Sequence, residues 1–179
     1  RWLPQWPQLV LAVNLSPREL RQRGCVARIR DCLQRHQVPA TALELEITEG
    51  VLLEEVEQCI SNMQALKALG VRFAIDDFGT GYSSFSYLKK YRLDVLKIDK
   101  SFIRDIQTDA NDAAIITAII KMSHSLNFKV IAEGVETAEQ AEASRDAGCD
   151  ELQGYLYAKP LNPHDAGQWL AALATAEQS

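Results

Sequence analysis

Short runs of apolar and β-branched residues alternate along the whole chain with longer stretches in which apolar residues recur at helical spacing. The expected strands are Leu9 to Val13, Leu43 to Ile47, Val71 to Ile75, Val95 to Ile98, Phe128 to Ala132 and Glu151 to Gln153. The expected helices are Cys25 to His36, Glu54 to Leu69, Ser83 to Lys89, Ala113 to Leu126, Ala138 to Ala147 and His164 to Leu173. This alternation predicts a parallel sheet with helices on its faces.

Capping residues support the same elements. Ser16 and Thr137 each stand three residues before a glutamate or glutamine, which is the spacing of a capping box. Asn162 directly precedes Pro163, an N-cap followed by proline at the first helical position. On the helix expected from Glu54, helical spacing puts five apolar residues on one face: Val56, Ile60, Met63, Leu66 and Leu69.

A parallel α/β sheet can be open and doubly wound, or closed into a barrel. No strand is followed by a Gly-x-Gly-x-x-Gly turn, which disfavours the dinucleotide-binding form of the open sheet. About six strand–helix units are present, against eight in a TIM barrel of about 250 residues. We therefore expect one α/β domain over residues 1–179: a TIM-type β/α barrel that is incomplete, with its first two strands missing and no second domain.

The composition narrows the class of protein. Of the 179 residues, 47% are hydrophobic and 24% charged, which is typical of a globular chain. The net charge of −5 disfavours binding to a nucleic acid polymer. The four cysteines lack zinc-site spacing and indicate a reducing compartment. Because no run of about 18 apolar residues occurs, we expect a cytoplasmic segment without membrane contact, although a parent protein could be anchored elsewhere.

Polar residues follow nearly every expected strand. In chain order they are Asn14, Glu46, Asp76, Asp77, Lys97, Asp99, Glu133 and Gln153. A parallel barrel brings the carboxyl ends of its strands together at the face where active sites lie. The converging carboxylates would repel one another unless cations were bound, and hard divalent ions prefer such oxygen ligands. The pattern predicts two divalent ions that clamp a phosphoryl group, with Lys97 orienting water or stabilising developing charge.

Some of these residues also have structural explanations. Taken alone, Asn14 is better explained as a turn residue, because Ser16 caps a helix next to it. Glu46 and Lys97 lie inside apolar runs, where an unpartnered charge would be costly, and this favours function. Asp99 is either a partner of Lys97 or a turn residue. The segment after Asp77 is rich in glycine and hydroxyl residues and is expected to form a loop over the active-site mouth.

Six strings stand at these strand ends. They are Val13-Asn14-Leu15-Ser16, Leu45-Glu46-Ile47-Thr48-Glu49, Asp76-Asp77-Phe78-Gly79-Thr80-Gly81-Tyr82-Ser83-Ser84, Leu96-Lys97-Ile98-Asp99, Ala132-Glu133-Gly134-Val135-Glu136 and Gln153-Gly154-Tyr155. In order and spacing they resemble the EAL phosphodiesterase family over nearly the whole chain. The resemblance implies a modified TIM barrel that binds two Mg²⁺ or Mn²⁺ ions and hydrolyses cyclic di-GMP to linear pGpG.

The resemblance also implies roles for single residues. The metal ligands would be Asn14, Glu46, Asp76, Asp77 and Glu133. Lys97 would hold the nucleophilic water, with Asp77 and Glu133 beside it in the catalytic set. Glu133 has been assigned both metal binding and the role of general base, and these two roles stay open.

Further residues would support the site. Glu49 would anchor the loop that begins at Asp76, and Glu136 and Gln153 would support the metal site and its water network, with Asp99 nearby. The loop itself comprises Phe78, Gly79, Thr80, Gly81 and Tyr82, and the resemblance ties it to homodimer contacts.

The Glu-Ala-Leu string that names the family is absent, together with the strand that carries it. We therefore interpret the chain as the C-terminal two-thirds or so of an EAL phosphodiesterase domain, whose own activity could be impaired. Two alternatives stay open. One is a non-catalytic receptor of cyclic di-GMP or a protein-interaction module. The other is a different barrel chemistry, such as proton abstraction by Lys97 with a carboxylate-held Mg²⁺.

Overall fold

The computed structural model describes residues 2–53, 57–79, 88, 91 and 93–176. The strands are β1 (Leu11–Asn14), β2 (Leu43–Thr48), β3 (Arg72–Phe78), β4 (Val95–Ile98), β5 (Lys129–Ala132) and β6 (Glu151–Leu152). The helices are α1 (Pro17–Leu20), α2 (Cys25–Arg35), α3 (Gly50–Leu53), α4 (Glu57–Ala68), α6 (Lys100–Arg104), α7 (Ala110–Ser125), α8 (Ala138–Ala147) and α9 (Pro163–Ala176), with a 3₁₀ turn at Ala40–Ala42.

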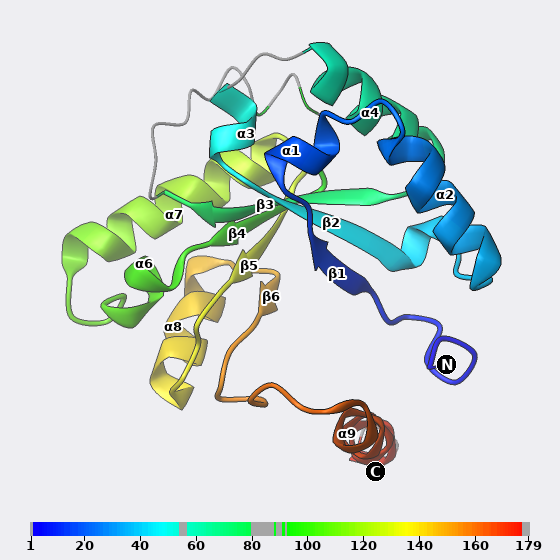
Figure 1. Cartoon of the computed structure of the whole chain (residues 1–179). Helices are drawn as coiled ribbons and strands as arrows, with labels where there is room; N and C mark the ends of the chain where they lie inside the picture. Colours follow the sequence, from blue (N-terminus) through cyan, green and yellow to red (C-terminus); the bar gives the residue numbers. More distant parts are fainter. Residues whose placement is uncertain (1, 54–56, 80–87, 89–90, 92, 177–179) are drawn as a thin grey trace.

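The strands form one parallel sheet in the order β1-β2-β3-β4-β5-β6, which is also their order along the chain. The sheet curls, and α2, α4, α7 and α8 cover its convex side (Figure 1). This arrangement confirms the expected TIM-type β/α barrel in incomplete form. Among the described residues, β1 and β6 are the two edges and do not pair with each other.

The convex face of the sheet holds the main hydrophobic core. Along β2, Leu43, Leu45 and Ile47 belong to this core, while the alternate residues Glu44 and Glu46 face the concave side. Both glutamates are nevertheless buried, so both faces of β2 are covered from Leu43 to Ile47.

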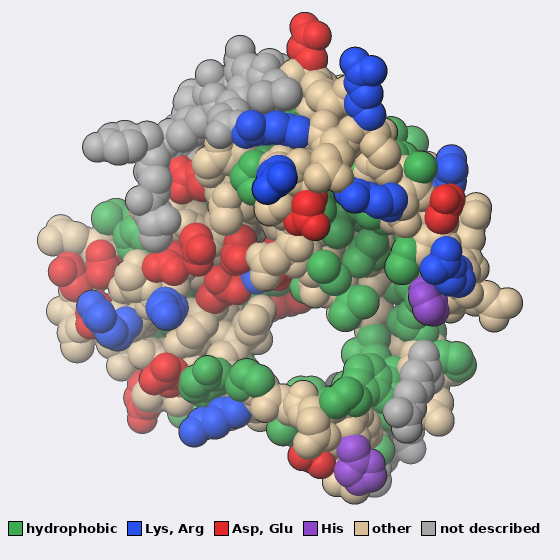
Figure 2. All heavy atoms as spheres, viewed as in Figure 1, with side chains coloured by type: hydrophobic (Ala, Val, Ile, Leu, Met, Phe, Trp, Pro, Cys, Tyr) green, Lys and Arg blue, Asp and Glu red, His purple; other side chains and the backbone are tan. Residues whose placement is uncertain are grey.

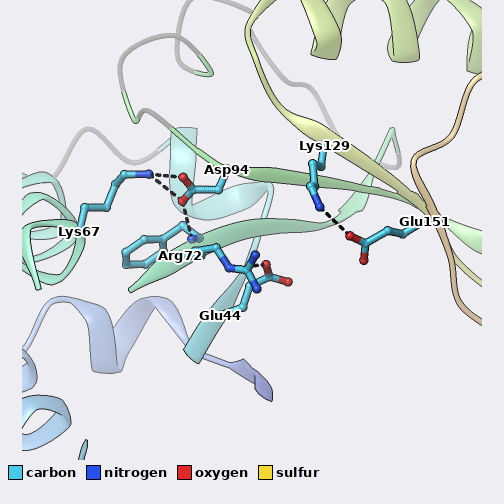
Figure 3. A network of polar contacts seen from close by, with 7 residues as sticks. Glu44, Lys67, Arg72, Asp94, Lys129 and Glu151 are labelled. Carbon is cyan, nitrogen blue, oxygen red and sulfur yellow. Dashed lines mark hydrogen bonds and ion pairs between the residues drawn. The ribbon is translucent and has the colours of Figure 1, made fainter. Parts of the chain in front are cut away.

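The concave face is layered. Its middle layer is a small apolar cluster of Ala74, Val95 and Ile131. Below it, at the amino ends of the strands, lie charged side chains that include an ion pair of Lys129 Nζ with Glu151 Oε1 at 3.0 Å (Figure 3). Above it, at the carboxyl ends, lie the residues singled out as candidate ligands. The apolar layer therefore separates two polar regions of the barrel interior.

The same polar arrangement recurs at the amino ends of two strands. Asp94, just before β4, accepts a hydrogen bond from Phe73 N at 2.9 Å, and its backbone N–H donates to Phe73 O at 3.0 Å. Asp150, just before β6, does the same with Val130, at 2.7 and 2.9 Å. Each carboxylate also contacts a side chain of a helix. Asp94 Oδ2 accepts a hydrogen bond from Lys67 Nζ on α4 (Figure 3), and Asp150 Oδ2 is hydrogen-bonded to His124 Nε2 on α7. We call these two arrangements the aspartate staples.

The capping predictions are confirmed. Ser16 and Thr137 both form complete capping boxes, and Asn162 Oδ1 accepts from His164 N at 3.0 Å. Two short helices in the described part of the chain were not predicted. One is α3, directly after β2, and the other is α6, which begins directly after β4 and is capped by Asp99. The helix expected from Glu54 to Leu69 is present as α4, and residues 54–56 at its expected start lie outside the described part.

The apolar face expected on that helix is only partly right. Met63 and Leu66 are fully buried, and Ile60 packs against the core. Leu69 is 40% exposed, because α4 ends at Ala68 and the chain turns away at Gly70, whose φ is +100°. Val56 and the helix expected from Ser83 to Lys89 fall on residues that the structure does not describe, apart from Leu88.

An opening lies between the concave face of the sheet and α9 (Figures 1 and 2). The N-terminal turn packs near α9: a Cβ added to Gly167 of this helix would lie 3.4 Å from Trp2 Nε1. Leu11 and Val13 on the edge strand β1 are 61% and 41% exposed, respectively. Among the described helices, none is long and apolar enough to span a membrane.

Candidate active site

The strand register brings the predicted ligands to one end of the barrel. Asn14 lies beside Glu46 across β1 and β2, and Thr48 lies beside Asp76 across β2 and β3. Acidic side chains gather in a band beside the central opening (Figure 2). The carboxyl ends of the strands therefore form an acidic mouth, as the alternation of strands and helices predicts.

Lys97 is the centre of this mouth. Its Nζ lies 2.6 Å from Glu46 Oε1, 3.2 Å from Asp76 Oδ1 and 2.6 Å from Glu133 Oε1. Only 3% of the residue is exposed, so the charge is held away from bulk water. A buried lysine is stable only when it is paired, and here carboxylates from β2, from β3 and from the residue after β5 provide the pairing. The geometry thus explains why a lysine stands inside an apolar strand.

The charges in this cluster shift one another's protonation. Burial alone would lower the pKa of Lys97, but its hydrogen bonds to Glu133 and Glu46 outweigh burial, and the pKa is raised. The ammonium therefore stays protonated. Burial raises the pKa of Glu133 to about 7, against the opposing effect of Lys97. A carboxyl group with such a pKa can exchange a proton near neutral pH, which suits a general base.

Three carboxylates could share a metal ion. Ligand oxygens of Asp76, Asp77 and Glu133 lie within 4.8 Å of one another. All three are hard oxygen donors, the type that Mg²⁺ and Mn²⁺ prefer, and the cluster carries an excess of negative charge over Lys97. Burial raises the pKa of Asp77, and the nearby carboxylates of Asp76 and Asp99 raise it further. The residues present therefore fit a divalent cation.

The backbone aims the adjacent aspartates in different directions. Asp77 has φ +53°, a left-handed conformation that is uncommon for a residue other than glycine. The pairing of β3 with β4 is irregular between Ile75 and Phe78, which marks the same place. Strained backbone often occurs where a side chain must be positioned for function, and here it lets both Asp76 and Asp77 serve the cluster.

Asp99 has a structural role that the sequence left open. Its Oδ1 accepts from Ser101 N at 2.9 Å and from the Ser101 hydroxyl, so it caps α6. Although burial raises its pKa, the bonds from Ser101 outweigh burial and lower it. Asp99 also lines the mouth close to Asp77. Lys97 forms its ion pairs with Glu46, Asp76 and Glu133 and not with Asp99, whose carboxylate caps α6 and shares a side-chain hydrogen bond with Asp77.

The start of the loop after Asp77 is held by two contacts. Glu49, which is buried, accepts from Gly79 N through Oε2 at 3.4 Å. A Cβ on Gly79, whose φ is +104°, would lie 2.6 Å from the Phe102 ring, so this position requires glycine. Phe78 is buried in the core. The other loop residues singled out from the sequence, Thr80, Gly81 and Tyr82, lie outside the described residues.

A hollow of about 340 Å³ opens beside the acid cluster. It is lined by Asp77, Asp99, Lys100, Glu133, Gly134, Glu136, Gln153, Gly154 and Tyr155. Glu136 and Gln153, expected to support the site, are thus on its wall and exposed to solvent. Lys100 and Tyr155 were not assigned to the site by the sequence. Their position directly after Asp99 and Gly154, at the ends of strands, is the sequence signal that would have assigned them to the site.

Asn14 lies at the edge of this arrangement. It is exposed at the end of β1, next to Glu46 in register. Its amide makes no hydrogen bond to the other candidate ligands among the described residues. The structure therefore brings Glu46, Asp76, Asp77, Lys97 and Glu133 together and leaves Asn14 as their neighbour across the sheet.

Several known proteins that are similar to this chain are named as cyclic di-GMP phosphodiesterases or were solved with this nucleotide bound. The chain is 44% identical over 154 residues to the cyclic di-GMP phosphodiesterase NbdA of Pseudomonas aeruginosa, covering 86% of this chain and 20% of that protein. The solved c-di-GMP complex of the Pseudomonas aeruginosa MucR phosphodiesterase superposes with a TM-score of 0.87 at 40% identity, covering 92% of this chain and 67% of that one. A manganese and c-di-GMP complex of Klebsiella pneumoniae BlrP1 has a TM-score of 0.81 at 32% identity, covering 88% and 41%.

The chain spans about a fifth to a quarter of the length of the curated relatives that it matches. The family model described as the EAL domain matches residues 1–160, which include every strand of the sheet and every residue of the acidic mouth. This chain belongs to the EAL domain family.

Proposed function

We propose that this chain carries the metal-binding and catalytic residues of a phosphodiesterase that hydrolyses cyclic di-GMP to linear pGpG. One observation carries the proposal: Lys97 and the carboxylates of Glu46, Asp76 and Glu133 converge within 2.6–3.2 Å at the active-site end of an EAL domain barrel. The relatives named as cyclic di-GMP phosphodiesterases and the complexes of solved relatives with this nucleotide support the choice of substrate.

Two divalent ions, Mg²⁺ or Mn²⁺, fit the oxygen donors of the mouth. Asp76, Asp77 and Glu133 would hold them, with Glu46 beside the cluster and Asn14 at its edge. When bound, such ions supply positive charge to the phosphate and lower the pKa of water. The manganese complex of BlrP1 supports this assignment.

The chain's own residues would act on the water and the phosphate. Hydrolysis requires a water oxygen to attack phosphorus, the bond from phosphorus to one ribose oxygen to break, and a proton to reach the leaving oxygen. Lys97 is fully charged and fixed by three carboxylates, so it can orient the water and stabilise negative charge. Glu133, with a pKa raised to about 7 by burial, can accept the proton from the water. Its metal-binding and base roles remain two alternatives within the proposal.

Supporting residues complete the proposal. Glu49 anchors the loop through Gly79, and Glu136 and Gln153 face the hollow. The loop from Phe78 to Tyr82 is proposed to contact a second copy in a homodimer, which light scattering of wild type and a Tyr82→Ala variant would test. The four cysteines are free thiols, which supports a reducing, cytoplasmic location.

The test is hydrolysis of cyclic di-GMP with Mg²⁺ or Mn²⁺, followed by separation of the nucleotides. The chain is compared with a form extended upstream, because the β1 and β6 edges lack a second strand partner among the described residues. Formation of pGpG that stops on chelation of the metal is expected for the extended form. Binding of the nucleotide without pGpG in both forms would identify a receptor instead, and would refute the catalytic roles.

A further inference from the structure

Lys100 is a positive charge in an acidic hollow. It is the first residue of α6 and lines the 340 Å³ hollow together with Asp77, Asp99, Glu133 and Glu136. Among the described lining residues it is the one cation. Its side chain is exposed and forms no ion pair within the described part of the chain. Lys97, in contrast, is buried and already paired with three carboxylates.

The backbone of Gly134 packs against Lys100 and holds it on this wall of the hollow. A Cβ on Gly134, whose φ is +68°, would lie 2.4 Å from Lys100 Cβ. The Gly134 backbone therefore packs directly on the base of the lysine stem and limits where it can swing. The exposed side chain of Lys100 lines the same hollow as the candidate metal ligands Asp77 and Glu133.

We propose that Lys100 binds the phosphodiester of the substrate that is not being hydrolysed. This inference rests on the proposed function, because cyclic di-GMP has two phosphodiesters and only one can occupy the metal cluster. We infer that the second lies against the wall of the adjacent hollow, where the carboxylates of Asp99 and Glu136 would repel it. An unpaired ammonium on that wall offsets the repulsion. Lys100 is thus a binding and specificity residue and takes no part in bond cleavage.

The test uses Lys100→Gln in the form that turns over the nucleotide, with Lys100→Arg as the conservative variant. Lys121→Gln is the matched control, since Lys121 is exposed on α7 and without an ion pair in the described part of the chain. Lys159→Gln is included because Lys159 Nζ lies 5.9 Å from the ring of Tyr155, which lines the hollow. KM and kcat are measured for cyclic di-GMP and for bis(4-nitrophenyl) phosphate, a diester with a single phosphate.

For cyclic di-GMP, Lys100→Gln is expected to raise KM about fivefold, the factor that one solvent-exposed charge contact supplies. Its kcat should stay near wild type, the effect should shrink at high salt, and Lys100→Arg should restore KM. For the single-phosphate diester, KM should be unchanged. Equal KM values for wild type and Lys100→Gln on cyclic di-GMP would overturn the inference, as would a rise with Lys159→Gln alone or an equal rise on both substrates. Wild type that hydrolyses only the single-phosphate diester would refute the choice of cyclic di-GMP, and with it this inference.

Discussion

At the scale of single residues, the site is built by burial of charge. Glu46 and Lys97 face the concave side of strands whose other face packs in the apolar core. They form an ion pair, with Lys97 Nζ 2.6 Å from Glu46 Oε1. Removal of one partner of a buried pair leaves the other uncompensated, which costs several kcal/mol. The lysine therefore holds the carboxylates together as well as serving the proposed reaction.

Lys97→Ala and Asp76→Asn are each expected to lower kcat for cyclic di-GMP by about a hundredfold or more, because each removes a charge that acts directly at the phosphate or the water. Turnover is measured at saturating metal, and the melting temperature reports whether the fold survives. Lys121→Ala serves as the control. Wild-type rates in a folded Lys97→Ala or Asp76→Asn variant would refute the proposed site.

Gly154 provides a test of packing next to the site. A Cβ at this position would lie 2.1 Å from Val135 O and 2.3 Å from Val135 N, and backbone atoms cannot move aside as a flexible side chain can. Gly154→Ala is expected to destabilise the protein by about 2–3 kcal/mol, measured by denaturant unfolding. Gly24→Ala is the control, since nothing lies within 4 Å of its added Cβ. Equal stability of the two variants would show that the β5 and β6 ends can separate freely.

At the scale of elements, the two aspartate staples join consecutive units of the barrel. Each uses an aspartate before one strand, the backbone of the previous strand and a side chain of the helix before that. The same hydrogen-bonding arrangement therefore occurs twice, between β3 and β4 and between β5 and β6. Because it lies at the amino ends of the strands, away from the acidic mouth, we expect it to affect stability more than catalysis.

Asp150→Asn is expected to lower the melting temperature by about 2–4 °C near neutral pH, equivalent to about 1 kcal/mol. Burial raises the pKa of Asp150, but the Val130 N–H and His124 outweigh burial, and the pKa is lowered in the folded state. Its contribution to stability is therefore fully present above the unfolded pKa of about 3.9 and is lost as the pH falls through the lower folded value.

The difference between wild type and Asp150→Asn, followed by thermal melts from pH 7 downwards, should consequently shrink in acid. Asp31→Asn is the control, because Asp31 is an exposed residue of α2 whose partner is the adjacent Arg30. A difference that stayed constant down to pH 2.5 would contradict the staple.

At the scale of the whole molecule, the half-barrel exposes what a closed barrel would cover. Within the described ranges, β1 has a strand neighbour on one side only, and the side chains of Leu11 and Val13 on this edge strand are exposed. A neighbouring groove of about 470 Å³, between the N-terminal segment and α9, is lined mostly by apolar residues. Unprotected strand edges favour association with other chains.

The isolated chain is therefore expected to associate as its concentration rises, and Leu11→Lys should reduce this association, because a lysine on an edge strand opposes pairing. Light scattering over a concentration series measures it. Arg30→Lys, an exposed change on α2, is the control. Identical concentration dependence of wild type and Leu11→Lys would show that the β1 edge is not the contact.

Much of this protein follows from its sequence alone. The alternation of apolar runs determined the parallel sheet, and the capping boxes at Ser16 and Thr137 determined where their helices begin, because both depend on neighbours in the chain. The polar residues at strand ends determined the place of the site, since parallel strands share one direction. The short helix α6 escaped prediction because Asp99 could not be recognised as its cap.

Only the tertiary structure decided how these residues meet. Distances across the sheet depend on register and curvature, so the pairing of Lys97 with Glu46, Asp76 and Glu133 could not be derived from spacing. The position of Lys100 against Gly134 and the two aspartate staples likewise join residues from separate units. Local pattern determined the elements and the types of side chain, whereas the free energy of packing the curled sheet determined which charges are buried together.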